Sequence, residues 1–150
     1  MQKNKVTVEV PSNIALVKYW GKEDSEMQWP ANDSISMTLS KSKTLTIVEE
    51  SLSGQDEIYF HGELLDASSA KAAKPLKHVE FLRESLGFEG FIKVSSTNSF
   101  PTGCGIASSA SGLGALTLAA VAYWSKESSF EALKAVGFGS SRLADLARMG

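Results

Sequence analysis

The spacing of the hydrophobic residues changes along this chain, and this change limits the folds that it can adopt. Valines alternate with polar residues over residues 6–10, and apolar residues alternate with serine and threonine over residues 34–40. A period of two is typical of a strand with one buried face. The sequence therefore predicts a strand in each segment, with Pro11 at the end of the first.

Two more segments of the first half have the composition of strands. Residues 44–48 and 57–60 are rich in β-branched and aromatic side chains, and the Ser-Gly-Gln-Asp sequence at 53–56 between them is typical of a turn. We expect these two strands to form an antiparallel pair. Residues 91–94 also have extended character.

Helical spacing replaces alternation in the second half. Leucine and valine recur every three or four residues in one segment, and a run rich in alanine and leucine follows it. The expected helices are residues 76–86, with Pro75 in the first turn and Gly87 as the C-terminal cap; 108–124; a short helix that begins at Ser128-Ser129 and ends near Gly137; and 140–149, followed by Gly150.

This order of elements predicts an α+β fold in which helices pack on one face of a mixed, mainly antiparallel sheet. The regular alternation of strands and helices that a doubly wound parallel sheet requires is not seen in the pattern. A length of 150 residues suits one domain. Because the chain stops at the end of an expected helix, at Gly150, we interpret it as a fragment of a longer protein.

The composition argues against several classes of function. Lysine and arginine total 15 against 17 acidic residues, and neither sign forms a long block, so nucleic-acid binding is not expected. No apolar run is long enough to span a membrane. The single cysteine, Cys104, cannot form an intramolecular disulfide, which fits a reducing compartment such as the cytoplasm. His61 and His78 have no Cys or acidic companions at fixed spacing, so no metal site is predicted.

The stretch 98–112 is the strongest candidate for a binding site. It leads from an expected strand into an expected helix, and Gly103 and Gly105 would let a ligand approach the backbone. Ser108 and Ser109 add hydroxyl donors at the helix N-terminus, which attracts anions. The spacing matches neither the Walker loop nor the dinucleotide fingerprint. The alternative is a tight connection whose small residues only permit close packing.

A second candidate segment, residues 11–22, follows the first strand. Lys18 and Lys22 are four residues apart and would share one face of a helical turn, where Tyr19 could add a hydroxyl donor. Such a segment can bind an anion. The alternative is a surface turn whose aromatic side chains lie in the core.

Together these stretches resemble the diphosphomevalonate decarboxylases, members of the superfamily that contains galactokinase, homoserine kinase, mevalonate kinase and phosphomevalonate kinase. Residues 13–22 resemble the hallmark of that family, and residues 30–36 resemble the segment that follows it. Residues 100–110 resemble its form of the superfamily's ATP loop, although Gly103-Cys104 replaces the usual pair of alanines. The resemblance runs in register through essentially the whole chain.

The resemblance implies the α+β fold of the superfamily's N-terminal domain and an ATP-dependent reaction. ATP with Mg²⁺ phosphorylates the 3-hydroxyl of mevalonate 5-diphosphate, and phosphate and carbon dioxide then leave to give isopentenyl diphosphate. The expected protein is a cytoplasmic enzyme and a homodimer that binds neither nucleic acid nor membrane. Residues 1–150 would be its N-terminal ATP- and substrate-binding domain, incomplete and without the C-terminal domain.

The binding residues of the family carry over position by position. Substrate contacts are implied for Lys18, Tyr19, Trp20, Gly21, Lys22 and Lys71. Lys71 stands where relatives often have an arginine, which is a better bidentate partner. ATP contacts are implied for Asn98, Gly103, Gly105, Ala107, Ser108 and Ser109. No catalytic or metal-binding residue is implied in this chain, because the general-base aspartate is expected downstream of Gly150, and we expect the isolated chain to be inactive.

Other functions stay open at this point. One is a related small-molecule kinase, such as a mevalonate 3-kinase, and another is a non-catalytic binding or assembly fragment. A cysteine hydrolase would use Cys104 in the glycine-containing loop as its nucleophile, but nothing links either histidine to it. Asp145 matches no catalytic position of the family.

Overall fold

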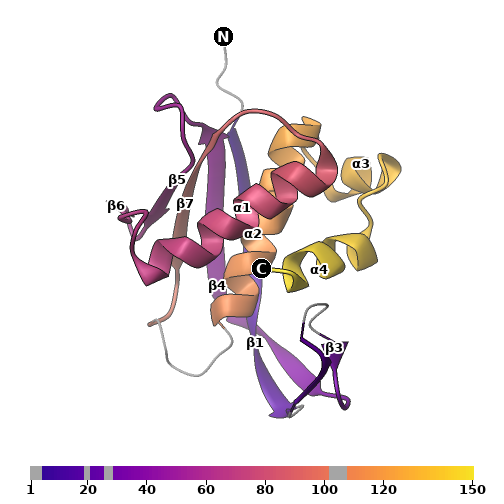
Figure 1. Cartoon of the computed structure of the whole chain (residues 1–150). Helices are drawn as coiled ribbons and strands as arrows, with labels where there is room; N and C mark the ends of the chain where they lie inside the picture. The colour runs from indigo at the N-terminus through magenta and orange to yellow at the C-terminus, as the bar shows by residue number, and fades with distance from the viewer. Residues whose placement is uncertain (1–4, 19–20, 26–28, 102–107) are drawn as a thin grey trace.

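The structure is a computed structural model that describes residues 5–18, 21–25, 29–101 and 108–150. Helices cover one face of a five-stranded sheet, and a two-stranded sheet lies beyond one end of it (Figure 1). The elements are, in chain order, β1 (Lys5–Val17), β2 (Lys22–Asp24), β3 (Trp29–Pro30), β4 (Ile35–Glu50), β5 (Glu57–Phe60), β6 (Glu63–Leu64), α1 (Ala70–Leu86), β7 (Ile92–Asn98), α2 (Ser108–Ser125), α3 (Phe130–Ala135) and α4 (Ser140–Arg148).

The predicted α+β class and the mixed, mainly antiparallel sheet are confirmed. The strand order of the larger sheet is β1-β4-β7-β5-β6. β4 pairs antiparallel with both β1 and β7, and β5 pairs antiparallel with β6, whereas β5 and β7 run parallel. Parallel neighbours need a crossover connection, which α1 provides between β5 and β7.

α2 is the central helix of the layer that covers the sheet. It contacts β1, β4 and β7 as well as α1 and α4, so little of its surface is exposed. Ala115, Ala119 and Ala120 are fully buried, and such small side chains let the helix approach the sheet closely. Within the described residues, no helix combines the length and the apolar character needed to cross a membrane. The main core contains Val48, Ile58, Val79, Leu82, Ile92, Val94, Leu116, Ala119 and Ala120.

The prediction that Pro11 ends the first strand is wrong. β1 continues to Val17, and its pairing with β4 shifts register directly after Pro11. A bulge on an edge strand is one of the few places in a sheet that tolerate the missing N–H of proline. β4 continues across the same irregularity, so residues 34–40 and 44–48 contribute to one strand instead of two.

The predicted antiparallel pair on either side of the 53–56 turn is also wrong, because β7 lies between β4 and β5. The N–H of Ser51 donates to the carbonyl oxygen of Phe91 (3.0 Å). The N–H of Ile92 donates to Asp56 Oδ1 (2.9 Å). Residues on both sides of the turn therefore bond to residues at the start of β7, which lies between β4 and β5.

The predicted helices are confirmed, with one correction at the start of α1. Ser69 caps α1 by accepting a hydrogen bond from the N–H of Ala72 (3.2 Å), so Pro75 lies in the second turn and not in the first. Gly87 ends the helix with a φ of 65°, a conformation that glycine adopts readily. Ser129 caps α3 through its side chain, one residue after Ser128, the N-cap position of the Ser-x-x-Glu capping pattern.

Candidate functional site

The structure brings the end of β7 close to the start of α2, on the two sides of the glycine-containing loop. Asn98 ends β7, the half-buried Ser108 begins α2, and Ser109 after it is exposed. The first turn of α2 contains no acidic residue, so the positive end of the helix dipole is not neutralised there. Three predicted ATP-binding residues lie outside the described part of the chain: Gly103, Gly105 and Ala107.

A chain of hydrogen bonds connects these two sides. Thr44 Oγ1 on β4 lies 2.8 Å from Asn98 Oδ1 and 2.8 Å from Ser111 Oγ. Ser111 Oγ in turn donates to the carbonyl oxygen of Ser108 (3.2 Å). We call these four residues, Asn98, Thr44, Ser111 and Ser108, the relay. The relay links the end of β7 to the first turn of α2 through Thr44 of the neighbouring strand, β4.

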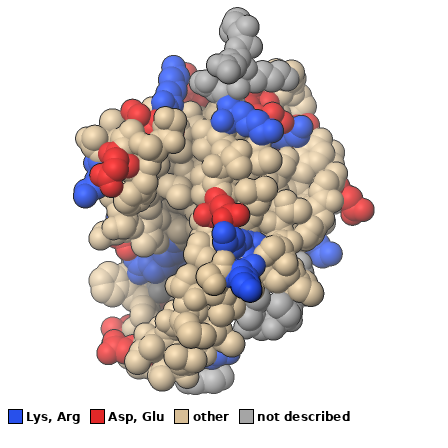
Figure 2. All heavy atoms as spheres, turned by 180° about the vertical axis from the view of Figure 1, so that it is seen from behind, with Lys and Arg blue, Asp and Glu red and all other residues tan. Residues whose placement is uncertain are grey.

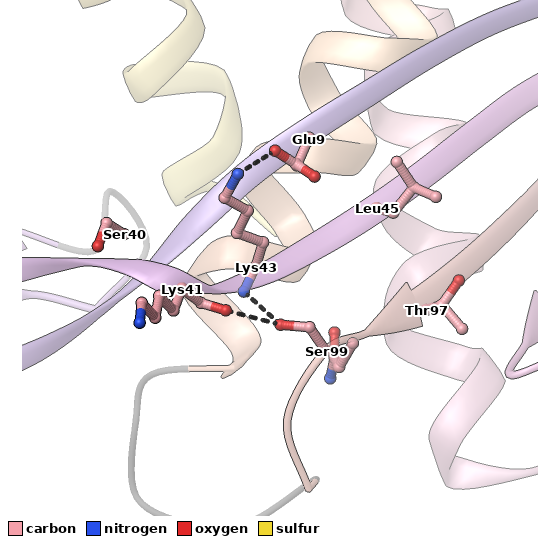
Figure 3. Close-up of a pocket in the computed structure, with 8 residues that line it drawn as sticks. Glu9, Ser40, Lys41, Lys43, Leu45, Thr97 and Ser99 are labelled. Atoms are coloured by element: carbon pink, nitrogen blue, oxygen red, sulfur yellow. Dashed lines mark hydrogen bonds and ion pairs between the residues drawn. The ribbon is translucent and has the colours of Figure 1, made fainter.

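A surface cavity of about 510 Å³ lies on the opposite face of the sheet (Figure 3). Side chains of a strand alternate between faces, so Lys43 and Leu45 point away from the helices when Thr44 points toward them. Ser99 Oγ accepts the backbone N–H of Lys43 (2.9 Å) at the edge of the cavity. The lining residues are Glu9, Ser40, Lys41, Lys43, Leu45, Thr97, Asn98 and Ser99.

One of the two lysines that line this cavity is paired within the sheet. Lys43 Nζ pairs with Glu9 Oε1 across β4 and β1, as the dashed line in Figure 3 marks. Figure 2 shows this side of the molecule, where basic and acidic side chains lie next to one another near the middle. The side chain of Asn98 points to the other face of the sheet, toward Thr44. We therefore place the candidate anion site at the start of α2 and not in the cavity.

Lys18, the first of the predicted substrate contacts, directly follows β1. The idea that Lys18 and Lys22 share a helical face is wrong, because Lys18 follows a strand and Lys22 begins another. Both side chains are exposed. Gly21 between them has a φ of 87°, and its carbonyl oxygen accepts the N–H of Ala31 (3.3 Å). Two further predicted substrate contacts lie outside the described residues: Tyr19 and Trp20.

Lys71 is not brought to this segment. It is exposed in the first turn of α1, which begins beside β6 (Figure 1). The hairpin of β2 and β3, which begins at Lys22, lies next to α4 on the other side of α2. A role of Lys71 in substrate binding therefore stays a prediction.

Arg148 is a cation near the substrate segment that the sequence reasoning missed. Its guanidinium carbon lies 5.4 Å from the ring centroid of Trp29 on β3, and its Nη2 donates to Asp145 Oδ1 (3.1 Å). β3 pairs with β2 at the position of Lys22, so α4 brings another positive charge to this hairpin. The available signal was a basic residue in the last turn of an expected helix.

His78 is a buried histidine that lies outside the candidate site. Burial and the nearby Lys74 lower its pKa to about 4. Its Nε2 lies 2.8 Å from Thr117 Oγ1 on α2. The described residues contain no group of three or more His, Cys, Asp or Glu side chains that could hold a metal ion, and Cys104 lies outside them.

Comparison with known proteins decides the family. The sequence model of the diphosphomevalonate decarboxylase-like N-terminal domain matches residues 10–144. The chain belongs to this family. The resemblance that residues 13–22, 30–36 and 100–110 indicate is thereby confirmed.

Relatives of the family are considerably longer than this chain. The diphosphomevalonate decarboxylase of Gibberella zeae is 34% identical over 77% of this chain and 34% of its own length. The crystal structure of mevalonate diphosphate decarboxylase from Staphylococcus aureus has a TM-score of 0.76 and 34% identity, and the match covers 96% of this chain and 41% of that one. A structure of MDDEF in complex with MVAPP, AMPPCP and magnesium has a TM-score of 0.73 and 34% identity, with 95% and 41% covered. The chain thus spans less than half the length of these proteins.

Proposed function

We propose that residues 1–150 form the N-terminal ATP- and substrate-binding domain of a diphosphomevalonate decarboxylase. The whole protein uses ATP and Mg²⁺ to phosphorylate the 3-hydroxyl of mevalonate 5-diphosphate, and it then releases phosphate and carbon dioxide to give isopentenyl diphosphate. Membership of the family over residues 10–144 supports this proposal. So does the similarity to MDDEF, whose structure contains MVAPP, AMPPCP and magnesium.

The observation that carries the proposal is the start of α2. The first N–H groups of a helix have no partner within the helix, and they attract anions together with the helix dipole. No acidic residue lies in this first turn, and Ser108 and Ser109 add two hydroxyl groups. The ATP phosphates bind here, and Mg²⁺, which those phosphates hold, offsets part of their charge.

The substrate diphosphate binds at the hairpin side of the molecule. Lys18 and Lys22 are exposed there, and the guanidinium of Arg148 lies close to the same hairpin. Cations of this kind attract a diphosphate and form charge-assisted hydrogen bonds with it. The general-base aspartate belongs to a part of the protein beyond Gly150, so we assign no catalytic residue to residues 1–150.

Product analysis of the full-length protein tests this function. With mevalonate 5-diphosphate and ATP, we expect ADP and carbon dioxide to form in equal amounts. Formation of ADP without carbon dioxide would indicate a kinase such as a mevalonate 3-kinase, and no turnover would indicate a binding fragment. The isolated 150-residue chain is the control, and we expect no turnover from it.

A further inference from the structure

The two middle residues of the relay are buried polar side chains. Thr44 is 1% exposed and Ser111 is 2% exposed. Ser111 lies in one row with the buried Ala115 and Ala119, since residues four apart share a helix face. If packing were the only requirement at position 111, alanine would be sufficient there. The buried hydroxyl groups are instead explained by the bonds that they make with each other and with the two sides of the loop.

The number of hydrogen atoms gives the relay a direction. It contains three contacts and ends at a carbonyl oxygen, which only accepts, and each hydroxyl has one hydrogen. If Asn98 accepts through Oδ1, two hydrogens have to serve three contacts. If the amide is turned so that Nδ2 faces Thr44, all three contacts have a hydrogen. The two amide atoms are nearly equal in shape, so the turned amide fits the same space.

We propose that Thr44 and Ser111 are positioning residues for the nucleotide. In the turned orientation Asn98 donates to Thr44, and Thr44 donates to Ser111. Ser111 then donates to the carbonyl oxygen of Ser108, which fixes the first turn of α2 relative to the end of β7. This inference rests on the proposed function, which places the ATP phosphates at the same turn.

The physical advantage is a helix N-terminus that points in one direction before ATP binds. A site that is ordered in advance loses less conformational entropy when the ligand binds. Fixed N–H dipoles also interact more favourably with a phosphate than dipoles that have to reorient. The relay therefore affects the affinity for ATP, although neither Thr44 nor Ser111 is proposed to touch it.

The chain contains a matched control for this inference. Thr46, which is 0% exposed, lies two residues further along the same face of β4, and its Oγ1 lies 2.8 Å from Ser96 Oγ on β7. Thr46 is paired with Ser96 in the sheet as Thr44 is with Asn98. The Thr46 bond joins β4 to β7 but, in the part of the chain that the structure describes, does not continue into α2.

The experiment compares Thr44→Val with Thr46→Val in the full-length protein. Each removes one buried hydroxyl and nearly keeps the shape of the side chain, so both are expected to lower the melting temperature. Only Thr44→Val is expected to raise the Kd for ATP with Mg²⁺ in titration calorimetry, by about five- to tenfold, as for the loss of one ordinary hydrogen bond. Thr44→Ser keeps the hydroxyl and is expected to bind ATP as the wild type does.

A second variant keeps the test conclusive if Thr44→Val does not fold. Ser111→Ala is expected to fold, because alanine favours a helix. It is expected to raise the Kd for ATP by a similar factor. Combining the two changes is expected to add little, because both break the same chain of bonds. The inference would be overturned if Thr44→Val and Thr46→Val changed the Kd equally, or if neither Thr44→Val nor Ser111→Ala changed it. In either case, ATP binding by the wild type would still support the proposed function. A wild-type protein that binds no ATP would overturn both.

Discussion

The two ends of the inner face of β4 differ in their chemistry. At one end Val48 pairs with Val94 of β7 and packs in the hydrophobic core with residues of α1 and α2. At the other end Thr44 pairs with Asn98, and its hydroxyl bonds into the first turn of α2. Both ends are equally buried, so the difference lies in the kind of interaction and not in access to water.

The apolar end of β4 mainly stabilises the fold, whereas the polar end mainly positions the first turn of α2. Burial of apolar surface contributes most to stability, but it has no preferred direction. A hydrogen bond contributes less, yet it fixes distance and angle. We therefore expect substitutions at the apolar end to lower the free energy of unfolding with little effect on ATP affinity. Substitutions at the polar end are expected to change ATP affinity as well.

Ile92→Ala is expected to have the largest effect at the apolar end. Ile92 is 0% exposed at the start of β7, and truncation leaves a cavity in the main core. We expect the free energy of unfolding in urea to fall by about 3 kcal/mol. Leu52→Ala, at a side chain that is 76% exposed, is the control and is expected to change little. A tenfold weaker binding of ATP by folded Ile92→Ala protein would contradict the expectation that the apolar end has little effect on ATP affinity.

His78 gives the apolar interior a pH dependence. Its folded pKa of about 4 lies below the ordinary value of 6.5, so the unfolded chain takes up the proton first as the pH falls. The contribution of His78 to the free energy of unfolding is therefore fully present above pH 6.5. It decreases as the pH falls toward 4, by up to about 3 kcal/mol at the lower end.

Unfolding between pH 7.5 and 4.5 measures this contribution. We expect a weaker pH dependence for His78→Gln than for the wild type. The same slope in His78→Gln and the wild type would show that this histidine is not responsible.

Arg83→Met is expected to have a smaller effect, also at the apolar end. Arg83 pairs with Asp56, and the two side chains are 19% and 12% exposed. Removal of the guanidinium leaves a largely buried carboxylate with the N–H of Ile92 as its described partner. We expect a loss of about 2 kcal/mol in the free energy of unfolding, with Glu84→Gln at the adjacent exposed position as the control. Equal stability of the two variants would argue against this ion pair.

The elements of the fold were predictable because their signals are local. Alternation and helical spacing identify most strands and all four described helices, and capping residues such as Ser129 and Gly87 locate their ends. The strand order was not predictable from these signals. β7 inserts between two segments that are neighbours in the sequence. Its ladders with β4 and β5, and the bonds of Ser51 and Asp56, all join residues that are far apart along the chain.

Only part of the candidate site was predictable from the sequence. Asn98 and Ser108 belong to a glycine-containing stretch and to a family motif, so the sequence points to them directly. Thr44 suits a strand by propensity alone, and its bond to Ser111 joins residues 67 positions apart. The one local signal was a serine in a row of small buried residues on α2, which packing does not require.

Hydrogen exchange at the start of α2 tests the central claim most directly. Amide groups at a helix N-terminus lack intrahelical partners and exchange readily until a ligand accepts their hydrogen bonds. In the full-length protein, ATP with Mg²⁺ is expected to slow exchange at Ser109 and Ala110 by about tenfold or more. Bound ATP that leaves exchange at Ser109 and Ala110 unchanged would contradict the account.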